Sequence, residues 1–160
     1  MDTKAQDGPR ELEGGCGGRT EETPIDRLKH LNMVYVITPY THDSKLIMNL
    51  RYAGAMRLTA WLISQGVSAV SPIVHCHPLA NRYEMPVDSQ FWKIYNLGLC
   101  QVSSAFVCCK LDLETIVDST GCCMELDFFE MEGICGYVAE ETTPRMEYNL
   151  TELFHGKDTE

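Results

Sequence analysis

The stretch Asp118-Ser-Thr-Gly-Cys-Cys-Met-Glu-Leu-Asp-Phe-Phe-Glu130 lies a few residues after the apolar run Ala105-Phe-Val-Cys-Cys-Lys-Leu111. The run is short, continuous and β-prone, which predicts a buried strand. Ser119 can cap a following helix, and Gly121 would let an anion such as phosphate approach its first turn. Glu125 lies about a turn and a half inside that helix. The pattern predicts an anion site beside a carboxylate; the alternative is a capped amphipathic helix with an exposed glutamate.

Length and composition indicate one globular domain. The 160 residues are 44% hydrophobic, 9% aromatic and 22% charged, which suits a folded core. A formal net charge of −10 argues against nucleic acid and anionic membranes as partners, although it leaves a small phosphorylated substrate possible. No apolar run is long enough to span a bilayer, and the N-terminus lacks a hydrophobic signal core. We therefore expect a cytoplasmic protein.

The eight cysteines form no C-x-x-C pair, and most fall inside apolar segments. Reduced cysteine behaves there as a small hydrophobic residue, so we expect no disulfide framework. His75, Cys76 and His77 are adjacent metal-ligand types, but no second ligand pair accompanies them. We therefore expect neither a metal nor any other cofactor.

The order of predicted elements indicates an α/β fold. We expect a disordered tail over residues 1–30, an α/β domain over 31–140 and a C-terminal extension over 141–160, with Pro144 in a charged loop. Strands are predicted over residues 33–37, 67–71, 105–111 and 134–138, and helices over 45–65, 88–101 and 119–132. Alternating strands and helices predict a single-domain, mostly parallel sheet with flanking helices.

Ligands of such sheets bind beyond the carboxyl ends of the strands. That rule places Thr38–His42, Ser71–His77 and Asp118–Gly121 on one rim. With residues 73–79 extended, His75 and His77 point to one side and could contact a base or a phosphate; local hydrogen bonding is the alternative. The sequence contains no G-x-G-x-x-G, P-loop or G-x-S-x-G motif, so dinucleotide, ATP and serine-hydrolase interpretations are weak.

Three other side chains have both a binding and a structural interpretation. Trp92 and Tyr83 could stack on a base, although aromatic residues at helical spacing usually pack in a core. Arg51 could pair with a phosphate, or lie solvated on the surface.

Four elements in order carry a family resemblance. They are Tyr35 with the turn Thr38-Pro39-Tyr40, the segment Ser71-Pro-Ile-Val-His-Cys-His-Pro-Leu-Ala80, the pair Phe91-Trp92, and Ser119-Thr-Gly-x-x-x-Glu125. Together they resemble the nucleoside 2-deoxyribosyltransferase superfamily, which includes deoxynucleoside 5′-monophosphate N-glycosidases, and are most similar to a small bacterial and phage branch. The resemblance covers about Met33 to Val138 and implies a Rossmann-like fold of that type.

The resemblance implies roles for individual residues. Glu125 matches the nucleophile that forms a covalent ribosyl-enzyme, which water or an acceptor base then resolves. Tyr35 matches the first-strand tyrosine, and Thr38 to His42 match the first-loop polar residues. Ser119 matches the phosphate- or sugar-binding serine, with Gly121 supplying a backbone N–H. Family members commonly form dimers or larger assemblies, so we expect a homo-oligomer.

One position departs from the family pattern. Where the family has an aspartate that helps protonate the leaving base or orient the sugar, this chain has Asn96, and Ser103 or Ser104 replaces a second aspartate. An amide cannot act as a general acid. The first interpretation is an N-glycosidase or deoxyribosyltransferase acting on a nucleoside or its 5′-monophosphate. The alternatives are a catalytically degenerate nucleotide-binding or sensing domain and a structural protein that meets a basic partner.

Overall fold

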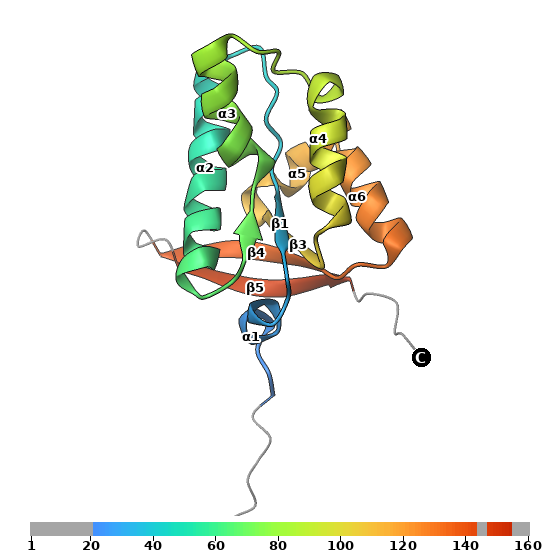
Figure 1. The fold of residues 1–160 in the computed structure, drawn as a ribbon. Helices are drawn as coiled ribbons and strands as arrows, with labels where there is room; N and C mark the ends of the chain where they lie inside the picture. The colour runs from blue at the N-terminus through green and yellow to red at the C-terminus, as the bar shows by residue number, and fades with distance from the viewer. Residues whose placement is uncertain (1–20, 144–146, 155–160) are drawn as a thin grey trace, which may run out of the picture.

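The computed structural model describes residues 21–143 and 147–154. Figure 1 shows its helices packed around a single sheet. The elements in chain order are α1 (Pro24–Lys29), β1 (Val34–Ile37), α2 (Lys45–Ser64), β2 (Ala69–Val70), α3 (Pro72–Tyr83), α4 (Ser89–Gln101), β3 (Ala105–Cys109), the 3₁₀ helix η1 (Lys110–Asp112), α5 (Leu113–Ile116), α6 (Thr120–Glu132), β4 (Gly136–Thr143) and β5 (Glu147–Phe154). No helix in these ranges is long and apolar enough to cross a membrane.

The sheet has the order β2-β1-β3-β4-β5. The pairs β1–β2, β1–β3 and β3–β4 are parallel, and β5 runs antiparallel to β4 at the edge. The predicted α/β fold with a mostly parallel sheet and flanking helices is therefore confirmed. Because β1 lies between β2 and β3, its carboxyl end opens at a switch in strand order, where ligands of such sheets bind.

Side chains of the central strands alternate between two hydrophobic cores. Val34 and Val36 pack with residues of α1 and α2 on one face. Tyr35 and Ile37 pack on the other face with residues of α4 and α6, Phe129 among them. Both faces are covered, as a parallel sheet requires. This alternation places the Tyr35 ring on the α4 and α6 face.

The predicted helix ends are confirmed at four positions. Ser119 caps α6 by accepting a 3.4 Å hydrogen bond from the Cys122 N–H, and Asp88 caps α4 by accepting one of 3.0 Å from the Phe91 N–H. Gly66 follows α2 with φ 87° and Gly133 ends α6 with φ 68°. These values lie in the left-handed region that favours glycine.

The extended geometry predicted for residues 73–79 is wrong, because the segment belongs to helix α3. Ser71 caps this helix, accepting from the Val74 N–H, and Pro72 occupies its first turn, where proline costs no hydrogen bond. Pro78 lies inside the helix and obscured it in the sequence. Residues two apart on a helix do not share a face, so His75 and His77 diverge.

The predicted division of the chain also changes at both ends. Within the predicted tail over residues 1–30, Pro24–Lys29 form α1, and Leu28 lies fully buried in the core; residues 1–20 lie outside the described part. The predicted C-terminal extension supplies the end of β4 and the edge strand β5, so it completes the sheet. Residues 144–146, with Pro144, and residues 155–160 lie outside the described part as well.

Candidate active site

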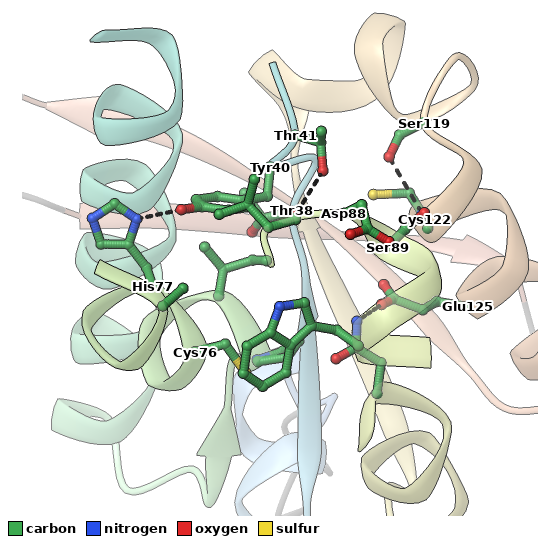
Figure 2. Close-up of a pocket in the computed structure, with 17 residues that line it drawn as sticks. Thr38, Tyr40, Thr41, Cys76, His77, Asp88, Ser89, Ser119, Cys122 and Glu125 are labelled. Atoms are coloured by element: carbon green, nitrogen blue, oxygen red, sulfur yellow. Dashed lines mark hydrogen bonds between the residues drawn. The ribbon is translucent and has the colours of Figure 1, made fainter. Parts of the chain in front are cut away.

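A hollow lies at the carboxyl end of β1, between the β1–α2 loop, α3, α4 and the start of α6. Figure 2 shows Glu125 on one side of it and Tyr40 with His77 on the other. The predicted site residues that line it are Thr38, Tyr40, His77, Trp92, Asn96, Ser119, Gly121 and Glu125. Its volume is about 50 Å³, and it shares several lining residues with an adjoining hollow of about 360 Å³. Pro39 lines the adjoining hollow.

Glu125 is held by two donors that meet at one oxygen. The Tyr35 hydroxyl donates a hydrogen bond of 2.7 Å to Glu125 Oε1, and Asn96 Nδ2 donates one of 2.9 Å to the same atom. In the described part of the chain, Oε2 accepts no hydrogen bond. The carboxylate is thus fixed through one oxygen, while its second oxygen stays available to a ligand.

Burial controls the ionisation of this carboxyl group. Glu125 is 4% exposed, and desolvation raises its pKa from 4.5 to about 7, against the opposing effect of the hydrogen bonds from Tyr35 and Asn96. The pKa of Tyr35 is also raised, first by burial and then by the charge of Glu125, so the phenol stays protonated and acts as a donor. Glu125 therefore changes charge near neutral pH, which suits a reactive carboxylate.

Asn96 has one buried atom without a partner. Its side chain is 7% exposed and lines the hollow, and Oδ1 has no hydrogen-bond partner while Nδ2 donates to Glu125. A buried acceptor left unpaired costs about 1–3 kcal/mol. A ligand hydroxyl or N–H placed beside Glu125 would recover that free energy.

The N-terminus of α6 forms the boundary between the two hollows. The N–H groups of Thr120 and Gly121, in its first turn, have no acceptor within the helix. A Cβ added to Gly121 would lie 3.2 Å from Ser89 Cβ, so this glycine also lets α4 and α6 approach closely. The predicted close approach at Gly121 therefore serves helix packing as well as any ligand.

The adjoining hollow contains charges of both signs. Arg51 lines it, and its Nη1 donates to the backbone oxygens of Tyr40 at 3.3 Å and Thr41 at 2.8 Å. Asp88 and Asp118 line the same space. Arg51 therefore fixes the β1–α2 loop while its guanidinium stays beside the hollow, and the two carboxylates oppose an incoming anion.

One side of the hollow consists of three aromatic side chains. Tyr40 comes from the β1–α2 loop, His77 from α3 and Trp92 from α4. The Tyr40 hydroxyl lies 2.6 Å from His77 Nδ1, and the His77 ring stacks on Tyr52 with centroids 4.1 Å apart. Trp92 Nε1 donates a hydrogen bond of 2.7 Å to the Pro86 backbone oxygen, which fixes the indole at the rim. These aromatic rings suit contact with a planar base.

Two predicted candidates lie elsewhere. His75 is exposed on α3, where its ring stacks on Tyr95 with centroids 5.7 Å apart, and it does not line the hollow. Tyr83 is 69% exposed at the end of α3 and also lies outside the hollow. Both positions follow from the helical geometry of α3.

Asn81 contacts the candidate site through His77, and the sequence analysis did not single it out. Its Nδ2 lies 2.8 Å from His77 Nε2, on the side of the imidazole opposite Tyr40. The spacing of four residues from His77 to Asn81 is the signal for such a contact, but only when the segment is interpreted as a helix.

A family model described as "Domain of unknown function (DUF1937)" matches residues 32–141, which is well over half of the chain. The chain belongs to the DUF1937 family. The DUF1937 match includes β1, the whole of α2 to α6 and Tyr35, Asn96 and Glu125. No curated protein matches the sequence. The DUF1937 domain of this chain therefore carries a buried, hydrogen-bonded carboxylate beside a hollow at the carboxyl end of β1.

Proposed function

We propose that this protein cleaves the N-glycosidic bond of a nucleoside or nucleoside 5′-monophosphate, with Glu125 as the nucleophile. The observation that carries the proposal is the pair of donors on Glu125 Oε1, because they leave Oε2 to attack an anomeric carbon. The resemblance to the nucleoside 2-deoxyribosyltransferase superfamily gives the same role to Glu125. The rim position of the hollow and its aromatic side chains support a ligand that combines a sugar with a base.

The proposed reaction has two steps. Oε2 forms a bond to the anomeric carbon while the bond to the base nitrogen breaks, which gives a ribosyl ester on Glu125. Water, or an acceptor base, then attacks the same carbon and releases the carboxylate. Tyr35 and Asn96 keep the carboxylate oriented through both steps. The unpaired Asn96 Oδ1 suits a hydrogen bond from a sugar hydroxyl.

We favour hydrolysis of a monophosphate over base transfer because of the α6 N-terminus. The N–H groups of Thr120 and Gly121 and the helix dipole suit a phosphate in the larger hollow, beside Arg51. The carboxylates of Asp88 and Asp118 work against that charge. Comparing the rate of base release from nucleosides with that from their 5′-monophosphates tests whether the phosphorylated substrate is preferred.

The second candidate is a nucleotide-binding or sensing domain without turnover. Asn96 favours it, since an amide in place of an aspartate supplies no proton to a leaving base. This candidate predicts that monophosphates raise the melting temperature while no base is released.

We also propose that the protein acts in the cytoplasm as a homo-oligomer. The described cysteines are all free, which suits a reducing compartment. Along α4, Phe91, Ile94 and Tyr95 are 49%, 87% and 38% exposed, and such apolar area suits a contact between copies. Sedimentation at working concentration should give a dimer or larger species; a monomer would contradict the assembly.

The test of the function is free-base release from a panel of nucleosides and 5′-monophosphates. We expect release by the wild type and a loss of at least about 10³-fold in Glu125→Gln, the scale seen when a nucleophile is removed. Glu130→Gln is the matched control, because Glu130 lies exposed on the same helix. Absence of release by the wild type, or equal release by Glu125→Gln, would refute the proposal.

A further inference from the structure

A chain of hydrogen bonds links three side chains on the side of the hollow opposite Glu125. Asn81 Nδ2 lies 2.8 Å from His77 Nε2, and His77 Nδ1 lies 2.6 Å from the Tyr40 hydroxyl. Tyr40 and His77 line the hollow, whereas Asn81 does not line it and contacts the imidazole. His77 is 8% exposed and stacks on Tyr52, so its ring orientation is fixed.

The chain of hydrogen bonds determines where the O–H group of Tyr40 points. Burial lowers the pKa of His77, which keeps the imidazole neutral with one ring N–H. An amide N–H can only donate, and with Asn81 Nδ2 as the donor to Nε2 the ring proton lies on Nδ1, where it can be donated to the Tyr40 oxygen. The Tyr40 oxygen therefore accepts from His77, and its own proton remains for a ligand.

The position of Tyr40 relative to Glu125 indicates what this proton can do. A carboxylate that displaces a base attacks the face of the sugar opposite the leaving group. Figure 2 shows Tyr40 and His77 across the hollow from Glu125. Building on the proposed glycosidic reaction, we propose that the Tyr40 hydroxyl donates the proton that the leaving base requires. In this arrangement His77 and Asn81 are positioning residues.

The step balances without another reactant. Glu125 Oε2 bonds to the anomeric carbon, the carbon–nitrogen bond breaks, and its electron pair goes to the base. The Tyr40 proton moves to the base, and the Tyr40 oxygen keeps the electrons of its O–H bond beside the Nδ1–H donor. Water then cleaves the ester, adds hydroxide to the sugar and returns its remaining proton to Tyr40. Tyr40 thus supplies the proton that the amide of Asn96 cannot donate to the leaving base.

The test compares the rates of base release from two substrates, only one of which needs a proton on its leaving base. A purine nucleoside methylated at N7 carries a fixed positive charge, so its base leaves as a neutral molecule without a proton, whereas the base of the unmethylated nucleoside needs one. We expect Tyr40→Phe to lower release of the unmethylated base by about 10²-fold or more, the usual size of general acid catalysis. Release of the methylated base should be nearly unchanged. His77→Phe, which keeps an aromatic ring against Tyr52, should show the same selectivity.

The controls separate this inference from the proposed function. Tyr83→Phe removes an exposed hydroxyl from the end of α3 and should change neither substrate. Glu125→Gln should lose both. If Tyr40→Phe lowers base release equally from both substrates, or from neither, the role of Tyr40 is overturned but the proposed glycosidase activity is not. If the wild type releases no base, both the role of Tyr40 and the proposed function are overturned.

A second measurement needs no turnover. Nitrogen-15 NMR of histidine-labelled protein reports which ring nitrogen of His77 carries the proton, with His77→Phe to assign the signal. We expect the Nδ1–H form. The Nε2–H form would turn the Tyr40 proton toward His77 and would overturn the inference.

Discussion

Tyr35 and Glu125 are separated by 90 residues in the chain, and the Tyr35 hydroxyl donates a buried hydrogen bond of 2.7 Å to Glu125 Oε1. The contact joins strand β1 to α6 on the face of the sheet that α4 and α6 cover. The Tyr35 ring also packs against Phe129 with centroids 5.6 Å apart, which holds the phenol in place. The sheet thus presents a fixed donor to the carboxylate.

Tyr35→Phe should move the ascending limb of the pH profile of kcat/KM to higher pH. The hydrogen bond lowers the Glu125 pKa, and one to a charged group contributes about 1.5–3 kcal/mol, so its loss should raise that pKa by about one to two units. Phenylalanine keeps the ring packing. The check is the profile from about pH 5 to about pH 9; an unchanged limb would show that Tyr35 does not set the ionisation of Glu125.

Asn96→Asp should keep much of the activity near and below neutral pH. Two carboxyl groups at this separation share a proton, so the introduced carboxyl group would stay protonated and donate to Glu125 as Asn96 Nδ2 does. The second ionisation of the pair should move well above that of Glu125 alone. Asn96→Leu, similar in size but without a donor, serves as the comparison. Equal losses in the two variants would contradict a donor role for this position.

Glu125→Gln should make the fold more stable than the wild type at alkaline pH. The Glu125 pKa is raised from 4.5 to about 7 on folding, so burying the charge costs free energy that appears as pH rises between these values. Glutamine still accepts from Tyr35 and Asn96. The difference in unfolding free energy should grow by up to about 3 kcal/mol from below the lower value to above the higher one. Urea denaturation checks this, and a pH-independent difference would argue against the raised pKa.

Gly121→Ala and Gly98→Ala should change stability in opposite directions. Gly98 lies within α4 with nothing within 4 Å of an added Cβ, so alanine should stabilise the helix by about 0.5–1 kcal/mol. At Gly121 the added Cβ would meet Ser89 Cβ at 3.2 Å, so the first turn of α4 would have to shift by a few tenths of an ångström to relieve the contact. We expect Gly121→Ala to lower both thermal stability and base release. Equal stabilisation by both variants would contradict the close approach at Gly121.

Local sequence signals predicted most of the strands and helices. The β-prone runs located β1 and β3, and the cap at Ser119 located the start of α6, because each signal acts within a few residues. The rule that parallel strands present their carboxyl ends at one rim then placed Tyr40, Ser119 and Glu125 near one another.

The errors arose where tertiary contacts or mixed signals decide the structure. Ile73 and Val74 are β-prone and Pro78 interrupts helical patterns, yet the cap at Ser71 and Pro72 starts α3. The meeting of Tyr35 and Asn96 on one oxygen of Glu125 depends on how α4 and α6 pack on β1, which no local pattern encodes. The Asn81 contact was hidden for the same reason, since it requires the helix first.

The measurement that tests the central claim most directly is the capture of the covalent intermediate on Glu125. A nucleoside with fluorine at C2′ should slow hydrolysis of the ester, because fluorine withdraws electrons from the oxocarbenium-like transition state. Intact-mass and peptide analysis should find one glycosyl group on the α6 peptide at Glu125 in the wild type and none in Glu125→Gln. Attachment at another residue, or base release without an adduct on Glu125, would contradict the account.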